Sequence, residues 1–87
     1  MNTFHTWMAK ASPSMQQRLA DEACAGSRAY LYQIKNGHRK AGVAMATTIV
    51  AFSKRFECKA LGLPIVDGAD IVADFNKHLF NTKEQTS

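Results

Sequence analysis

The sequence Gly26-Ser27-Arg28-Ala29-Tyr30-Leu31-Tyr32-Gln33-Ile34-Lys35-Asn36-Gly37-His38-Arg39-Lys40 contains the signals for one short, sharply bounded helix. Glycine can end a preceding helix in the left-handed conformation, and a serine directly after it can cap the amides of a new one. Leu31 and Ile34 are spaced three apart, which places both on one side of that helix. Asn36-Gly37 is a stop signal. The stretch therefore predicts a helix over residues 28–36 with one side buried.

The opposite side of this helix carries residue types that contact nucleic acid. It consists of Arg28, Ala29, Tyr32 and Gln33. Arg can bind guanine through two hydrogen bonds, Gln can bind adenine in the same way, and Ala can contact a thymine methyl group. Tyr32 can donate to a phosphate or lie against a base, although a partly buried core ring is the other interpretation. A helix with this face is suited to the major groove.

Positive charge is concentrated in and after the same stretch. The net charge is +4, and residues 27–59 hold seven basic residues against the single acid Glu57, a net of +6. Such asymmetry is typical of a surface that faces phosphates, although a solvated basic face without a partner is the alternative. The side chains near the predicted helix exit, where a DNA backbone would run, are Lys35, Asn36, His38, Arg39 and Lys40.

Two further helices are predicted before this stretch. Residues 3–11 place apolar side chains at helical spacing, with Trp7 as a core anchor rather than a base-stacking residue. Ser12-Pro13 can start the next helix, which runs to residue 23 and ends at Gly26. Gln17 lies near its start, where free amides favour phosphate. The two helices around Gly26, separated by a short link, match the helix-turn-helix pattern.

The chain after residue 40 is predicted to hold two more helices. Residues 43–56 carry Met45, Ile49, Phe52 and Phe56 on one face. Residues 57–68 form a connector, and residues 70–80 have apolar side chains at every fourth position, which favours a fifth helix. A hairpin turning at Asp67-Gly68 is the alternative. The expected dimer interface of this segment consists of Ile71, Val72, Phe75 and Leu79.

Composition excludes several other classes of protein. With 87 residues, one domain is expected, and no apolar run approaches the roughly 20 residues that cross a bilayer. The N-terminus lacks the pattern of a secretory signal, so a cytoplasmic location is expected. Cys24 and Cys58 have no second ligand at metal spacing, and the three histidines belong to separate segments. We therefore expect no metal, cofactor, small-molecule ligand or catalytic site.

These motifs resemble a known family of regulators. Gln-x-x-Leu-Ala at residues 16–20 and Ser-Arg-x-Tyr-Leu-x-Gln-Ile-x-Asn-Gly-x-Arg at residues 27–39 resemble the Cro and phage-repressor class of helix-turn-helix proteins. Short Cro-like or YdaS-like prophage and plasmid members are the most similar. The resemblance covers residues 3–56. The segment between Ala20 and Ser27 is one residue longer than the commonest family spacing, so the angle between the two helices can differ.

The resemblance implies an all-α, compact five-helix domain with the lambda-repressor-like fold. It implies a prokaryotic, sequence-specific repressor that binds a palindromic operator in double-stranded DNA as a homodimer. By position, bases would meet Arg28, Ala29, Tyr32 and Gln33, and the DNA backbone would meet Gln17, Asn36 and Arg39. Ser27, at the start of the same helix, is also expected to contact the backbone. The expected organisation is a DNA-binding domain at residues 1–60, a dimerisation segment at 61–80 and a frayed tail at 81–87.

Other functions fit the same residues. An antitoxin or anti-repressor could retain the fold and bind a protein instead, because fold does not determine function. RNA is a less suitable ligand, since its major groove is too narrow for a helix. Activation and repression differ in operator position, which the protein sequence does not encode.

Overall fold

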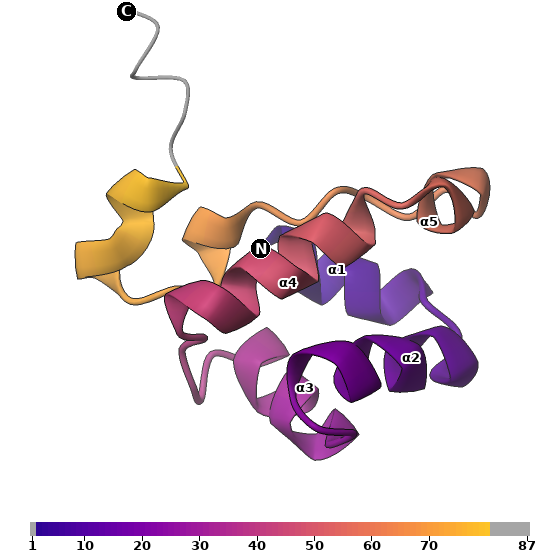
Figure 1. The fold of residues 1–87 in the computed structure, drawn as a ribbon, viewed down its shortest axis with the longest axis horizontal. Coiled ribbons are helices and arrows are strands. Elements are labelled where there is room, and N and C mark those ends of the chain that lie inside the picture. The colour runs from indigo at the N-terminus through magenta and orange to yellow at the C-terminus, as the bar shows by residue number, and fades with distance from the viewer. Residues whose placement is uncertain (1, 81–87) are drawn as a thin grey trace, which may run out of the picture.

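The computed structural model describes residues 2–80 and is almost entirely helical (Figure 1). Over this range it contains no strand, and its one β-bridge is the isolated parallel pair of Ala41 and Val72. The expected all-α class is confirmed. The elements in chain order are α1 (Thr3–Lys10), α2 (Pro13–Ala23), α3 (Arg28–Lys35), α4 (Val43–Ser53), α5 (Phe56–Ala60) and the 3-10 helices η1 (Gly68–Asp70) and η2 (Asp74–Leu79).

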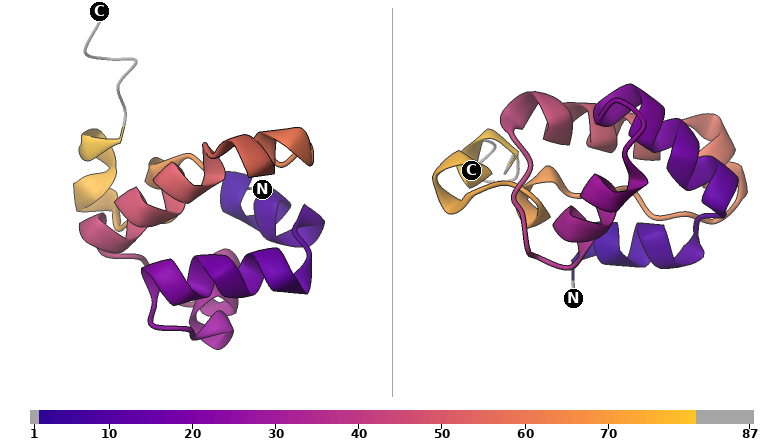
Figure 2. Two further views of the ribbon diagram at one scale, coloured as in Figure 1. Left: turned by 45° about the vertical axis from the view of Figure 1, so that its right-hand side comes forward. Right: turned by 90° about the horizontal axis from the view of Figure 1, so that it is seen from below.

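The arrangement leaves α3 on one long side of the molecule (Figures 1 and 2). The chain after α4 runs along the opposite side, from α5 at one end to η2 at the other. The helices α1, α2 and α4 lie between these two sides and supply most of the core. One face of α3 is therefore packed against the domain, and its other face is directed away from it.

Side-chain caps set the starts of the first three helices. The hydroxyl of Ser12 accepts a hydrogen bond from the Met15 amide at 3.1 Å, and the hydroxyl of Ser27 accepts one from the Tyr30 amide at 3.2 Å. Asn2 caps α1 in the same way through the His5 amide. Each cap satisfies an amide that has no partner within its helix. The predicted starts at Ser12 and Ser27 are confirmed.

The turn between α2 and α3 depends on two consecutive residues in the left-handed conformation. Ala25 has a φ of 53° and Gly26 a φ of 87°, and the Gly26 amide donates to the Ala20 carbonyl at 2.9 Å. Glycine adopts this conformation without the steric cost that a Cβ atom imposes. The predicted role of Gly26 is confirmed, whereas the strained conformation of Ala25 was not predicted.

Substitutions in this turn should change stability in opposite directions. Gly26→Ala should lower the free energy of unfolding by about 1 kcal/mol, because a Cβ atom is strained at positive φ. The added Cβ atom would also lie 3.2 Å from Oδ1 of Asp21. Ala25→Gly should raise the free energy of unfolding by about 0.5 kcal/mol, since it removes strain at some entropic cost. Urea denaturation measures both; equal effects would contradict the assigned geometry.

Trp7 lies at the centre of the core. It is fully buried, its ring is stacked on Phe4 at 6.2 Å between centroids, and it meets Phe52 edge-on at 6.0 Å. Aromatic pairs in these arrangements stabilise a core beyond the area that they bury. The core interpretation of Trp7 is confirmed, and its ring is not accessible to a base.

The fourth helix ends earlier than predicted. It stops at Ser53, and Phe56, expected on its buried face, begins α5 with 83% of its surface exposed. Arg55 has left the helical conformation, forms an ion pair with Glu22 of α2 and stacks over the Phe52 ring. This pairing between distant segments turns the chain before Phe56, so the prediction for residues 54–56 was wrong.

Ion pairs join α2 to α5 and its N-cap. Arg18 binds Glu57 at 2.8 Å, and Arg55 binds Glu22. The hydrogen bond from Arg55 lowers the pKa of the Glu22 carboxyl, and the bond from Arg18 does the same for Glu57. All four side chains are exposed enough to be screened by solvent, so the network orients α5 more than it stabilises the fold.

The predicted fifth helix at residues 70–80 is also wrong, and the alternative hairpin does not form. The segment instead contains η1 and η2, separated by residues 71–73, of which Ile71 and Val72 are buried. The amide of Ala41 donates to the Ile71 carbonyl at 2.7 Å, and the carboxylate of Asp70 accepts from the amide and hydroxyl of Thr3. These contacts draw the segment into the core of the same chain.

This packing corrects two expectations. Ile71 and Val72 are not available to a second chain, so only Phe75 and Leu79 of the expected dimer interface are exposed. Residue 60 is not a structural boundary either, because four later side chains belong to the same core: Leu63, Val66, Ile71 and Val72. The expected frayed tail at residues 81–87 lies outside the described residues.

Candidate nucleic-acid interface

The two sides of α3 differ as predicted. Leu31 and Ile34 are buried in the core, whereas Ala29, Tyr32 and Gln33 are exposed. Arg28, at the first position of the helix, is half-buried. The exposed face of α3 therefore consists of the side chains that the periodicity assigned to it.

Arg28 connects the beginnings of α2 and α3. Its Nη1 atom donates to the Pro13 carbonyl oxygen at 3.2 Å, across 15 residues of sequence. A guanidinium group has five N–H donors, so most of them stay free for another acceptor. Arg28 is thus held at the edge of the exposed face by one bond and keeps its capacity for a bidentate contact.

Tyr32 is fixed by the buried Gln16, for which no structural role was predicted. The Tyr32 hydroxyl donates to Oε1 of Gln16 at 2.9 Å, and Nε2 of Gln16 donates to the carbonyls of Met8 and Ala11. Gln16 precedes Leu19 and Ala20 by three and four residues, so its place on the apolar stripe of α2 was a usable signal. The hydroxyl of Tyr32 is occupied, and Nζ of Lys35 lies over its ring, 5.0 Å from the ring centre.

Removal of the Tyr32 hydroxyl should destabilise the protein. Tyr32→Phe leaves the amide oxygen of Gln16 without its donor, which should cost about 1–2 kcal/mol of unfolding free energy. Tyr30→Phe is the matched control, because no hydrogen bond of the Tyr30 hydroxyl occurs within residues 2–80, and it should cost less than about 0.5 kcal/mol. Thermal and urea unfolding of the two variants give the comparison; equal losses would show that the bond to Gln16 contributes nothing.

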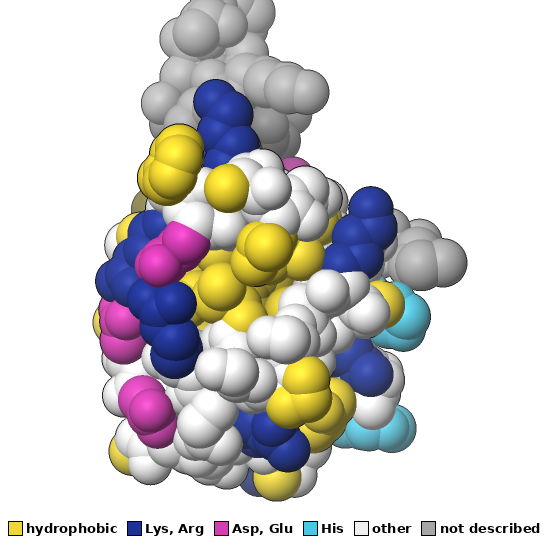
Figure 3. Space-filling model, turned by 90° about the vertical axis from the view of Figure 1, so that its right-hand side faces the viewer, with side chains coloured by type: hydrophobic (Ala, Val, Ile, Leu, Met, Phe, Trp, Pro, Cys, Tyr) yellow, Lys and Arg dark blue, Asp and Glu magenta, His cyan; other side chains and the backbone are white. Residues whose placement is uncertain are grey.

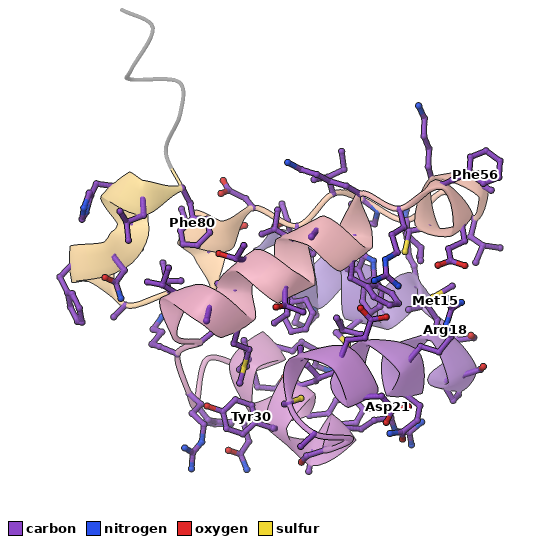
Figure 4. All side chains as sticks on the ribbon, in the orientation of Figure 1. Met15, Arg18, Asp21, Tyr30, Phe56 and Phe80 are labelled. Carbon is purple, nitrogen blue, oxygen red and sulfur yellow. The ribbon has the colours of Figure 1, made fainter. Side chains whose placement is uncertain are left out.

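Gln33 and Arg39 form a second pair on the exposed side (Figure 4 labels the neighbouring Tyr30). Nε of Arg39 donates to Oε1 of Gln33 at 2.8 Å, and the guanidinium carbon lies 5.1 Å from the centre of the Tyr30 ring. Bidentate adenine recognition uses both the oxygen and the amino group of a glutamine. Gln33 can therefore read adenine only if Arg39 releases the oxygen, for example to a phosphate.

Two of the expected backbone-contacting residues have roles within the fold. Nε2 of Gln17 donates to the Gly26 carbonyl at 2.9 Å and to Oδ1 of Asp21 at 3.1 Å, which braces the turn before α3. The Ser27 hydroxyl caps α3. For the side-chain amide of Gln17 to contact a phosphate, it would have to give up its hydrogen bond to Gly26 or its hydrogen bond to Asp21. Asn36, His38, Arg39 and Lys40 are exposed beyond the end of α3, and Lys35 in its last turn is half-buried.

The basic residues of segment 27–59 lie on two separate surfaces. Arg28, Lys35, Arg39 and Lys40 lie on or beside α3, and no ion pair in the described part of the chain involves them. Lys54 and Lys59 lie instead in and beside α5, where Arg55 is neutralised by Glu22 and Glu57. The positive field relevant to α3 is therefore carried by four side chains rather than by the whole segment.

Several other kinds of site are not found between residues 2 and 80. No group of three or more His, Cys, Asp or Glu side chains there could hold a metal ion, and no helix is long and apolar enough to cross a bilayer. Burial raises the pKa of the Cys24 and Cys58 thiols, which disfavours the reactive thiolate. Comparison with protein-family models, curated proteins and solved structures gives no match.

Proposed function

We propose that this chain is a sequence-specific, double-stranded DNA-binding transcriptional repressor of the Cro and phage-repressor class. In this proposal α2 and α3 form the helix-turn-helix, α3 enters the major groove, and a dimer binds a palindromic operator. The protein acts in the prokaryotic cytoplasm, on the nucleoid. One observation carries the proposal: four cations that form no ion pair within residues 2–80 surround a helix whose outer face is exposed.

The positions of these cations suit a duplex. Arg28 lies at the N-terminus of α3, and Lys35, Arg39 and Lys40 lie at its C-terminal exit. A cation at a helix N-terminus is unfavourable unless an anionic or electron-rich ligand approaches it. DNA supplies such groups at both positions, as guanine acceptors in the groove and as phosphates along its edges.

The contacts fall into two classes in this proposal. Arg28, Ala29, Tyr32 and Gln33 meet base edges, with Tyr32 contributing its ring because its hydroxyl is held by Gln16. The basic and polar side chains after α3 meet phosphates and set the register without reading sequence. Binding to DNA would exchange the Arg39 to Gln33 bond for one phosphate contact and one base contact.

Base-reading side chains should affect specificity rather than general affinity. Arg28→Ala and Gln33→Ala should each weaken binding to the cognate site by about 1–3 kcal/mol and relax preference at one base position. Binding to random DNA should change little, because phosphate contacts dominate it. Fluorescence anisotropy on cognate and scrambled duplexes measures both quantities. A loss of equal size on the two duplexes would remove these residues from the base-reading set.

Selection of bound duplexes from a random DNA pool tests the function as a whole. The proposal requires an enriched motif with two-fold symmetry and half-sites whose centres are about one helical turn apart. A pool that stays unenriched at low salt would refute sequence-specific DNA binding. Lac-type reporter repression from a promoter carrying the enriched site then separates a repressor from an activator.

A protein-interaction module, such as an antitoxin or anti-repressor, is the second candidate. The observation that favours it is the exposed apolar pair of Phe56 and Leu61 on the side of the molecule away from α3. Phe56→Ser with Leu61→Ser discriminates between the two candidates. If α3 is the functional surface, the double variant should still bind DNA and keep its activity in the host. If a protein partner binds Phe56 and Leu61, the double variant should lose its activity in the host.

A further inference from the structure

We infer that Tyr30 is a positioning residue for DNA binding: its ring holds the guanidinium of Arg39 ready for a phosphate, although Tyr30 itself touches no DNA. The guanidinium carbon of Arg39 lies over the Tyr30 ring, 5.1 Å from its centre. A cation at this distance from an aromatic face is attracted by the ring. The inference rests on the proposed DNA-binding function, and it assigns a role to a side chain that belongs to neither class of proposed DNA contacts.

Tyr30 is a fixed support, because the domain sets its position. It is the third residue of α3, and its amide donates to the Ser27 hydroxyl at 3.2 Å. Its ring is half-buried and packs against the core. Figure 4 shows Tyr30 on the side of the molecule that α3 forms. A ring with so little freedom of its own can restrain a long side chain that lies on it.

Arg39 is a side chain that needs such a restraint. It is exposed in the segment after the end of α3. Its backbone amide donates to the Gln33 carbonyl at 3.2 Å, which ties the main chain to α3 but leaves the side-chain torsions free. Ordering an arginine on binding opposes affinity, because the side chain has many rotamers to lose. An arginine already placed on the Tyr30 ring has lost part of that freedom before DNA arrives.

Two contacts hold the Arg39 side chain in the free protein, and they differ in what they leave for DNA. Nε of Arg39 donates to Oε1 of Gln33 at 2.8 Å, and in the proposed complex this bond is exchanged. The contact with the Tyr30 ring uses no hydrogen-bond donor, so a phosphate can accept from the guanidinium while the ring contact persists. Tyr30 is therefore the group that keeps Arg39 beside α3 once Gln33 has turned to a base.

Arginines elsewhere in the domain show that the charge of Arg39 is uncommitted. The guanidinium carbons of Arg18 and Arg55 also lie over an aromatic ring, that of Phe52, at 5.8 and 4.5 Å from its centre. Both of these arginines are paired with glutamates as well. Figure 3, which looks onto the end of the molecule with α5, shows Lys and Arg side chains beside Asp and Glu. Arg39 has the ring but forms no ion pair within residues 2–80, so its charge is available to a phosphate.

Binding of full-length variants to the cognate duplex and to a random duplex tests the inference. Tyr30→Leu keeps an apolar side chain against the core but removes the ring, and it should weaken binding to both duplexes about threefold. Tyr30→Phe keeps the ring and should bind like the wild type. Arg39→Ala should lower the slope of log K against log salt by about 0.9 on both duplexes. In the Arg39→Ala background, Tyr30→Leu should have no further effect, because no cation is left for the ring to hold.

The contact itself can be followed by NMR, independently of affinity. Ring-current shifts should move the Cδ protons of Arg39 upfield in the wild type and in Tyr30→Phe, both free and bound to the random duplex. Loss of these shifts on addition of the duplex would show that Arg39 leaves the ring, which overturns the inference. Thermal unfolding establishes that each variant is folded at the temperature of the measurements. If Tyr30→Leu is not folded there, Tyr30→Met replaces it, since methionine adapts to irregular space in a core.

The binding results separate failure of the inference from failure of the proposed function. Equal losses in Tyr30→Leu and Tyr30→Phe, or an undiminished loss in the Arg39→Ala background, would mean that Tyr30 acts on the fold and not through Arg39. A wild type that binds both duplexes and a Tyr30→Leu variant that binds them equally well refute the inference alone. A wild type that binds neither duplex at low salt refutes the proposed function, and the inference with it.

Discussion

A chain that ends at residue 60 is expected not to fold. The truncation removes Leu63, Val66, Ile71 and Val72, all buried in the same core as Trp7. At about 1.5–3 kcal/mol for each buried apolar side chain, the loss is roughly 6–12 kcal/mol. That is comparable to the whole stability of a small domain, about 5–15 kcal/mol. Circular dichroism and urea denaturation of residues 1–60 should show neither native helix content nor a cooperative transition.

Truncation after Ala73 is the control for this experiment. It removes η2 and the residues beyond it but keeps all four buried side chains, so cooperative unfolding should persist. Some stability should be lost, because Phe80 no longer covers Gly68. A cooperative transition in the 1–60 chain of nearly wild-type size would instead restore residue 60 as a domain boundary.

The largest expected effect on DNA binding comes from the lysines beside α3. Lys35→Ala combined with Lys40→Ala removes two cations that have no acidic partner in residues 2–80. Each lost phosphate contact lowers the slope of log K against log salt by about 0.9, so the slope should fall by roughly two. Affinity at low salt should fall about a hundredfold for cognate and random DNA alike. Anisotropy titrations between low and moderate salt measure both quantities.

Lys54→Ala combined with Lys59→Ala is the matched control. It changes the net charge by the same amount, but these lysines lie in and beside α5, on the side away from α3 (Figure 1). The salt slope should stay at its wild-type value and the affinity should change only slightly, because screening limits charge effects beyond about 10 Å. Equal slopes in the two double variants would mean that net charge, and not the α3 surface, drives binding.

The first three helices could be predicted because local signals determine them. Ser12 and Ser27 cap amides three residues ahead, and Gly26 takes the left-handed conformation that ends α2. The spacing of Leu31 and Ile34 set the buried side of α3 correctly. Each of these signals acts within a few residues of chain, so a single sequence is enough to read it.

The last third of the fold could not be predicted because it depends on distant contacts. Asp70 binds Thr3, Val72 pairs with Ala41, and the amide of Val66 donates to the Ser53 hydroxyl. The apolar spacing that suggested a helix at residues 70–80 reflects instead two buried residues between short 3-10 turns. Tertiary packing overrode a periodic pattern of marginal length.

The candidate site was only partly predictable for the same reason. Which residues of α3 face outward followed from helical spacing. What those side chains bind within the molecule did not, because the bond from Tyr32 to Gln16 joins residues 16 positions apart and the bond from Arg28 to Pro13 joins residues 15 positions apart. The separation of the basic residues 27–59 into two surfaces was also not predictable, because it depends on the ion pair between Arg55 and Glu22, which lies 33 residues earlier in the chain.

The contact between Thr3 and Asp70 has a consequence for how the protein is made. It joins residues 67 positions apart, and Ile71 and Val72 complete the core directly after it. On a ribosome, the first four helices emerge while the apolar surface that these residues cover is still open. Contacts of such long range delay folding and leave intermediates prone to aggregation. Productive folding therefore waits for nearly the whole chain, and translation stalled near residue 60 would yield a chaperone substrate.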